Sequence, residues 1–168
     1  RGHGKYIEIA ALFGWEAVGQ INQYYYNLGI SYGVERDDFI LNASKQLNIN
    51  LAPLFHIWGF IPSEETLSEL VTLPSSNEIK ERLEHYRTIV PRNKEEFVAY
   101  FNAMIDAGKS GDRNKERWEA MAGDGYAAYP EYSSVIADEI IAEIDAILCT
   151  YYNACLLYTS DAADELSR

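Results

Sequence analysis

The stretch that decides the fold is SVIADEIIAEIDAILCTYY, residues 134–152. Its apolar side chains recur three or four residues apart, which is the spacing of one face of an α-helix. We expect the buried stripe to consist of Val135, Ile140, Ile144, Ile147, Leu148 and Tyr151. The acidic residues fall largely off this stripe, and they are Asp138, Glu139, Glu143 and Asp145. The segment therefore predicts a long amphipathic helix.

The rest of the chain shows the same helical periodicity. It predicts further helices over residues 6–28, 37–47, 51–58, 63–74, 77–91 and 93–107, and a short one around Trp118. Gly14 is expected to interrupt the first of these, and residues 108–116 are the most loop-like stretch. No segment shows strand alternation and no internal repeat is present. We expect an all-α fold, an irregular multi-helix bundle.

Local signals mark several helix starts. Asp37 or Asp38 is expected to cap the helix that carries Phe39. Ser63 begins the next long helix, and residues 75–78 and 93–96 each have the order of a capping box. The inner stripe of the helix over residues 63–74 is expected to be Leu67, Leu70 and Val71.

Composition excludes some classes of function. The formal charge is −12, from 26 acidic and 14 basic residues, so the chain lacks the basic surface that a nucleic-acid binder needs. No apolar run reaches the roughly 20 residues of a membrane span. Thirteen tyrosines and three tryptophans suit a core, an interface or a sugar-binding face, and composition leaves these three open.

No complete catalytic motif is present. A helical zinc peptidase needs H-E-x-x-H, whose spacing places both imidazoles on one helix face. His3, His56 and His85 lie far apart and none is followed by glutamate, so we interpret them as structural or surface residues. The tripeptide within Gly108-Lys109-Ser110-Gly111 lacks the earlier glycine and the preceding strand of a phosphate-binding loop. We therefore assign no catalytic or metal-binding residue.

Two weaker patterns have a structural and a functional interpretation. The pairs Glu64/Glu65 and Glu95/Glu96 lie in first helical turns, where the helix dipole favours them, and a glycosidase pair would need a cleft around them. The run Tyr24-Tyr25-Tyr26 is typical of the end of a buried helix with one ring exposed. It also fits a platform on which a sugar stacks.

One ordered set of motifs is more specific. It comprises Phe13-Gly14-Trp15-Glu16, Asp38-Phe39, Ala43-Ser44, Asn50-Leu51-Ala52-Pro53-Leu54-Phe55, Trp58-Gly59-Phe60 and Thr72-Leu73-Pro74. In order and spacing this set resembles the C-terminal half of the catalytic domain of enhancin-like zinc metallopeptidases, peptidase family M-sixty, of the gluzincin type. The matching stretch runs from about residue 5 to 74. Its residues also make sense as packing, since Phe55 and Trp58 would fix the Phe39 helix against the first one.

The resemblance implies a secreted or cell-surface parent enzyme that uses zinc to cleave mucins or other glycoproteins. The zinc-binding H-E-x-x-H segment and the downstream glutamate ligand would lie upstream of Arg1, so this chain alone would bind no zinc and be inactive. Residues 1–74 would be the C-terminal helical part of the peptidase-like domain, and residues 75–154 a helical extension. The alternative is a non-enzymatic helical module that binds protein or carbohydrate and shares only packing motifs with the peptidases.

The two ends of the chain also carry expectations. The chain opens Arg1-Gly2-His3-Gly4, with no initiator Met or signal peptide, and we expect a truncation there. The string CLLYTSDAADE, residues 155–165, resembles the translation of a transposon-type sequencing adapter. We expect residues 155–168 to be a non-native tail. Cys149 and Cys155 are too few for a disulfide framework.

Overall fold

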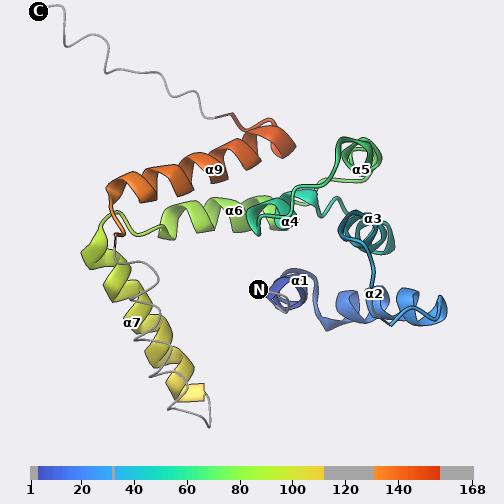
Figure 1. The fold of residues 1–168 in the computed structure, drawn as a ribbon, viewed down its shortest axis with the longest axis horizontal. Coiled ribbons are helices and arrows are strands. Elements are labelled where there is room, and N and C mark those ends of the chain that lie inside the picture. The colour runs from blue at the N-terminus through green and yellow to red at the C-terminus, as the bar shows by residue number, and fades with distance from the viewer. Residues whose placement is uncertain (1–3, 32, 112–130, 156–168) are drawn as a thin grey trace, which may run out of the picture. The chain divides into compact units, whose positions relative to one another are not determined.

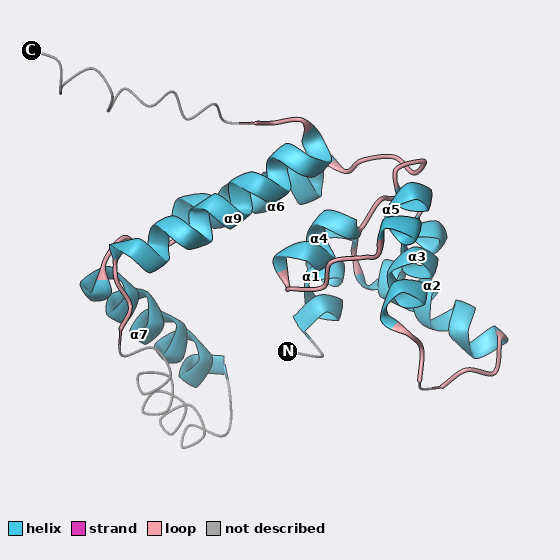
Figure 2. Cartoon of the chain, turned by 45° about the horizontal axis from the view of Figure 1, so that its top comes forward, coloured by secondary structure: helices cyan, strands magenta, loops and turns pink. Residues whose placement is uncertain are grey.

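A computed structural model describes residues 4–31, 33–111 and 131–155 of the chain. These residues form eight helices, which Figure 1 shows in chain order. The helices are α1 (Gly4–Phe13), α2 (Trp15–Asn27), α3 (Arg36–Leu47), α4 (Ala52–Ile57), α5 (Glu64–Leu70), α6 (Asn77–Ile89), α7 (Lys94–Gly111) and α9 (Ser134–Tyr152). Figure 2 shows helices and loops and no strand among the described residues, which confirms the all-α prediction. The short helix expected around Trp118 lies outside the described residues.

The chain divides into two compact units. The first unit consists of residues 1–84 and 144–168, and the second of residues 85–143. The first unit therefore combines α1 to α5 with the first part of α6 and the C-terminal part of α9. The second unit has its own aromatic contact, because the rings of Phe97 and Tyr132 stack with centroids 4.4 Å apart. The Tyr132 hydroxyl also donates a hydrogen bond of 2.6 Å to the Pro91 carbonyl.

Three glycines at positive φ shape the first unit, and Gly14 interrupts the first predicted helix as expected. Gly14 separates α1 from α2 with φ +83° and ψ 165°, a conformation open essentially to glycine alone. Gly29 and Gly33, also at positive φ, bracket the loop between α2 and α3. The turn at Gly14 lets the two helices pack together, and Ile9 of α1 and Ile21 of α2 are both fully buried.

The caps predicted for α5 and α7 are confirmed, whereas the cap of α6 and the C-terminal end of α7 differ from the prediction. Ser63 caps α5 by accepting from the Thr66 amide, and Asn93 caps α7 by accepting from the Glu96 amide, as expected. The cap of α6 is one residue later than the 75–78 box predicted, because Ser76 accepts from the Ile79 amide at 3.2 Å. The helix α7 continues through Gly111, so residues 108–111 of the predicted loop are helical, and residues 112–116 lie outside the described residues. Helix propagation outweighs the cost of about 1 kcal/mol for each glycine within it.

The buried faces of α5 and α9 are rotated from those predicted. In α5 Leu70 is fully buried, but Val71 is 74% exposed because it follows the last helical residue. In α9 Ile144, Ile147 and Leu148 are buried as predicted, whereas Val135 is 63% and Ile140 39% exposed. The buried stripe runs through Ala137, Ile141, Ile144 and Leu148, at spacings of four, three and four, and Asp145 and Ile147 are buried beside it. The burial of Asp145 differs from the prediction that the acidic residues fall largely off the buried face.

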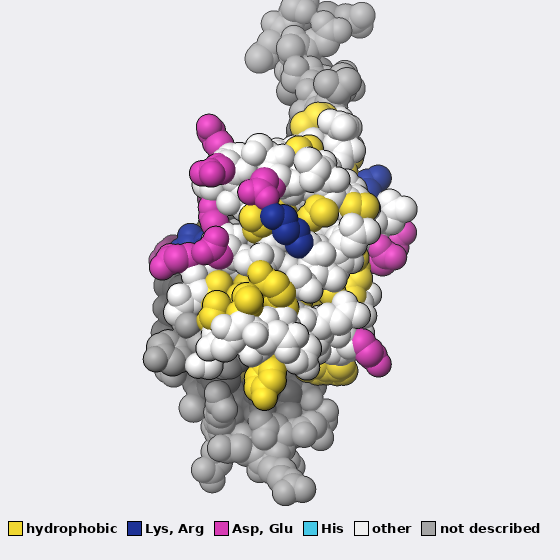
Figure 3. Space-filling view, turned by 90° about the vertical axis from the view of Figure 1, so that its right-hand side faces the viewer, with side chains coloured by type: hydrophobic (Ala, Val, Ile, Leu, Met, Phe, Trp, Pro, Cys, Tyr) yellow, Lys and Arg dark blue, Asp and Glu magenta, His cyan; other side chains and the backbone are white. Residues whose placement is uncertain are grey.

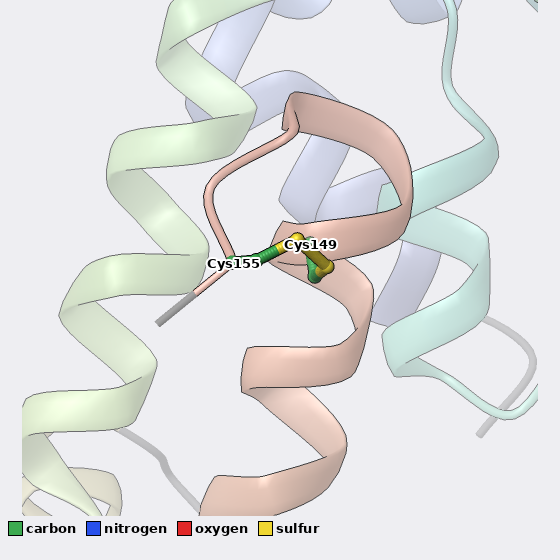
Figure 4. The surroundings of a disulfide bond; sticks show 2 residues. All are labelled: Cys149 and Cys155. Carbon is green, nitrogen blue, oxygen red and sulfur yellow. A yellow bond between two sulfur atoms is a disulfide. The ribbon is translucent and has the colours of Figure 1, made fainter. Parts of the chain in front are cut away.

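A disulfide closes the end of α9. Cys149, on the last turns of that helix, is bonded to Cys155 (Figure 4). The bond spans a sequence separation of only six residues, so it removes little chain entropy from the unfolded state.

A chain that ends at Ala154 is expected to stay folded. Loss of so short a covalent loop costs at most about 2 kcal/mol by the chain-entropy argument. Ile144, Ile147 and Leu148 remain to bury α9. Urea unfolding of the 1–154 chain beside a full-length Cys155→Ser variant measures this, since both lack the bond. A much larger loss on truncation than on substitution would contradict the expectation that the tail contributes nothing else.

Candidate functional site

The two histidines in the described part of the chain have different neighbours. His56 of α4 lies 3.3 Å from the Tyr151 hydroxyl through Nδ1, with the two rings edge to face, so it joins α4 to α9 within the first unit. His85 is exposed beside the Tyr86 ring, and His3 lies outside the described residues. The described part of the chain contains no group of three or more His, Cys, Asp or Glu residues placed to hold a metal ion.

The paired glutamates lie on the surface in the first turns of α5 and α7, where the sequence placed them. Glu64 and Glu65 are exposed at the start of α5, as are Glu95 and Glu96 at the start of α7. Glu96 is occupied by capping, because its carboxylate accepts from the Arg92 amide at 2.7 Å. The dipole and capping interpretation accounts for these residues without a catalytic role.

The candidate site among the described residues is a cavity of about 530 Å³ in the first unit. Its lining residues come from α1, α2, α3 and α4, from the α2–α3 loop and from the segment that follows α4. Its aromatic members are Tyr6, Tyr25, Tyr26, Phe39, Phe55 and Phe60. Residues Ile30, Ser31, Gly33 and Val34 of the α2–α3 loop form another part of its wall. Both the volume and the largely aromatic lining are typical of a small-molecule pocket.

Phe39 is the centre of the aromatic wall. Its ring stacks on Tyr25 at 5.8 Å with an interplanar angle of 8°, and meets the edges of Tyr6 and Phe55 at 5.9 Å each. Phe55 in turn contacts Trp58 at 5.6 Å. These contacts join α1, α2, α3 and α4, so the same cluster that packs the helices also builds the pocket.

The Tyr24–Tyr26 run lies at the end of α2, where one ring is buried and another is exposed. Tyr25 is only 9% exposed while Tyr26 is 79% exposed, as expected for the end of a buried helix with one free ring. Both rings nevertheless line the cavity. Burial raises the pKa of the Tyr25 and Tyr6 hydroxyls above their ordinary value. The Tyr25 hydroxyl donates to the Asp38 carbonyl at 3.5 Å.

Two cationic side chains also line the pocket, and neither was predicted from the sequence. The Lys5 ammonium lies 4.4 Å from the Phe39 ring centre and 5.4 Å from that of Tyr6. The Arg36 guanidinium lies 5.1 Å from the ring centre of Phe60. Burial lowers the pKa of Lys5 below its ordinary value. No described residue that lines the cavity is acidic.

Asp37 fixes the start of α3 beside the pocket. It was expected to cap its own helix, but the N-cap of α3 is Glu35, with no side-chain hydrogen bond, and Asp37 reaches α5 instead. Its carboxylate accepts from the Ser63 amide at 2.9 Å and from the Thr66 hydroxyl at 3.2 Å. This contact between α3 and α5 holds the turn from which Arg36 points.

Replacing Asp37 with alanine is expected to lower the free energy of unfolding by about 1 kcal/mol, the usual net value of a hydrogen bond. Hydrogen bonding by Ser63 lowers the pKa of Asp37 below its ordinary value. Its contribution is therefore complete above the unfolded-state pKa of about 4 and is lost as the pH falls through the lower folded-state pKa. Urea unfolding of wild type and Asp37→Asn between pH 7 and pH 2 should show the gap between them closing in acid. A gap that is constant with pH would contradict the role of the charge.

Comparison of the chain with protein-family models, with curated proteins and with solved structures finds no match. None of the helices in the described part of the chain is both long and apolar enough to cross a membrane.

Proposed function

We propose that this chain is the helical C-terminal part of the catalytic domain of a zinc metallopeptidase that acts on mucin-type or other glycoproteins. The observation that carries the proposal is the ordered resemblance over residues 5–74. In support, these motifs pack together in one unit rather than lying on separate surfaces. Leu51, Pro53, Leu54 and Phe55 are all buried, and Phe55 contacts Phe39 of the preceding motif.

The chain would serve the parent enzyme as a wall of the substrate cleft. The described residues do not fit a zinc site, so no catalytic step is assigned to any of them. The metal, its ligands and the general base would come from an H-E-x-x-H segment of the parent. Exposed apolar side chains in the first unit suit a surface that packs against such a segment. Among them are Ile7, Trp15, Ile61 and Val71.

Figure 3 shows the face of α2, α3 and α5, where hydrophobic side chains form separate patches among acidic ones. A surface of this mixed kind is compatible with an interface inside a larger, water-exposed enzyme.

The coding sequence upstream of Arg1 tests the proposal. We expect an H-E-x-x-H motif within roughly 60–150 residues, the span of an ordinary domain. The longer protein should cleave a glycoprotein, and a chelator or a Gln in place of the motif's Glu should abolish the cleavage. An upstream region without the motif would overturn the proposal.

A second candidate, a non-enzymatic binding module, is favoured by the aromatic pocket. The two candidates predict different oligomeric states and unfolding for an isolated chain of residues 1–154. A complete module should be monomeric and unfold cooperatively, whereas a cut domain should associate through its exposed apolar side chains. Size-exclusion chromatography and thermal unfolding of this chain separate the two.

A further inference from the structure

We propose that the pocket lined by Lys5, Arg36 and the Phe39 cluster binds a small organic anion that contains a ring. The shared chemistry is one anionic group attached to a flat or chair-shaped ring, as in an aryl carboxylate or an acidic sugar. The inference concerns the first unit alone and does not depend on whether the parent protein is a peptidase.

The size of the cavity sets the scale of the ligand. A volume of about 530 Å³ lies within the range of roughly 300–1,000 Å³ that small-molecule sites occupy. It holds one or two rings and is too small for a folded partner. Six of its lining side chains are aromatic, so a ring entering the cavity meets aromatic faces and edges.

The charge of the cavity has the opposite sign to that of the chain. The whole sequence carries −12, yet the ionised side chains that line the cavity are Lys5 and Arg36. The described residues that line the cavity include two cations and no carboxylate. This charge favours binding of an anion and disfavours binding of a cation.

Both cations lie over aromatic rings, and Arg36 also interacts electrostatically with the carboxylate of its neighbour Asp37. The structure gives the Lys5 ammonium contacts with the Tyr6 and Phe39 rings, and the Arg36 guanidinium a contact with Phe60. A ring face orients a cation but leaves its N–H donors free for another acceptor. The lowered pKa of Lys5 has desolvation as its cause, and a ligand carboxylate beside it would offset that cost.

Polar groups on the rim suit the remainder of such a ligand. Asn22 of α2 and Ser31 of the following loop also line the cavity, and they can donate to or accept from hydroxyl groups. The pocket thus combines a ring-binding wall, two cations and a few hydrogen-bonding groups, which is the usual division of roles in a specific small-molecule site.

Isothermal titration of the 168-residue chain tests the inference. The probes are benzoate and glucuronate, each beside its neutral counterpart, benzyl alcohol and glucose. We expect at least one of the two anions to bind at least 10-fold more tightly than its neutral counterpart, as loss of a charge-assisted hydrogen bond implies. Preference for benzoate would identify an aryl anion as the ligand, and preference for glucuronate an acidic sugar.

Substitutions connect the binding to the two cations. Lys5→Gln and Arg36→Gln are each expected to weaken binding of the preferred anion at least 10-fold, and Lys5→Arg to retain it. The matched control is Lys80→Gln, which removes a half-buried lysine of α6 that pairs with Glu84. Arg36 is exposed, so its variant carries the test even where Lys5→Gln lowers stability.

A spectroscopic readout is independent of affinity. The Lys5 pKa, followed by NMR of the lysine side chains, should rise when the preferred anion is bound. Equal binding of neutral and anionic probes, no binding of either anion at 10 mM (about 3 kcal/mol of affinity), or equal effects of Lys80→Gln and Arg36→Gln would each overturn the inference.

Discussion

Replacing Phe55 with alanine is expected to lower the free energy of unfolding of the first unit by about 3–5 kcal/mol. The ring is 2% exposed and lies between Phe39 of α3 and Trp58 after α4. Its removal leaves a cavity that the neighbouring helices cannot fill, because Pro53 and Gly59 fix both ends of the short helix that carries it. The loss therefore combines the transfer energy of the ring with that of the cavity.

Urea unfolding followed by circular dichroism and tryptophan fluorescence measures this loss. Phe55→Leu should cost much less, because leucine keeps most of the buried volume. Tyr26→Ala is the matched aromatic control, and its ring is 79% exposed, so a change within about 0.5 kcal/mol is expected. A Phe55→Ala variant as stable as Tyr26→Ala would contradict the aromatic cluster as the centre of the unit.

Sequence predicts the helices of this chain well because their ends depend on neighbouring residues. A glycine at positive φ such as Gly59, or a hydroxyl one residue before a helix such as Ser63, acts within a few positions of where it stands. These signals are readable without knowing what packs against the helix.

The motifs predicted the contact of Phe55 with the Phe39 helix. Other contacts between distant segments were not predicted, because they depend on the fold and not on neighbouring residues. Asp37 has the sequence context of a local cap, and only the fold brings Ser63, 26 positions later, to its carboxylate. The stripe of α9 was misplaced because Ile140 and Ile141 are adjacent isoleucines, and periodicity alone did not decide which faces the core. The neighbouring helices decide that.

The sequence drew attention to the tyrosines of the pocket but not to its two cations. The tyrosine run was identified as a platform or a buried helix end, and it lines the cavity as part of α2. Lys5 and Arg36 carry no motif, since a single basic residue in an acidic sequence is ordinary surface until the fold sets it over a ring. A search of the sequence for isolated cations next to aromatic residues, as in Lys5-Tyr6, would have found only the first of them.

The residues of the resemblance and those of the pocket partly coincide. Phe39, Phe55 and Phe60 belong to the motifs that resemble the metallopeptidases, and all three line the cavity. Lys5 lies at the edge of that stretch and Tyr26 falls between its motifs. In the proposed metallopeptidase, these packing motifs would maintain the scaffold while the residues between them set what the cavity accepts.

Replacing Gly14 with alanine is expected to lower the free energy of unfolding by about 1–3 kcal/mol, the cost of holding a side chain in this backbone conformation. Gly14 has φ +83° and ψ 165° between α1 and α2, and its amide donates to the Ala10 carbonyl at 2.9 Å. A Cβ there would lie 2.9 Å from the Glu16 carboxylate, which can swing away. The expected loss is therefore one of backbone strain.

Gly19, in the second of these two helices, provides a control for which the opposite change in stability is expected. It lies inside α2 with open space around the position of a Cβ, so Gly19→Ala should raise stability by about 0.5–1 kcal/mol. Lys5 is carried by α1, so the strained Gly14→Ala variant should also weaken anion binding, and Gly19→Ala should leave it unchanged. Thermal unfolding and titration of both variants measure the two effects together. Equal stability of the two variants would mean that the turn at Gly14 does not need positive φ. Equal anion binding by the two variants would mean that this turn does not set the position of Lys5 over Phe39.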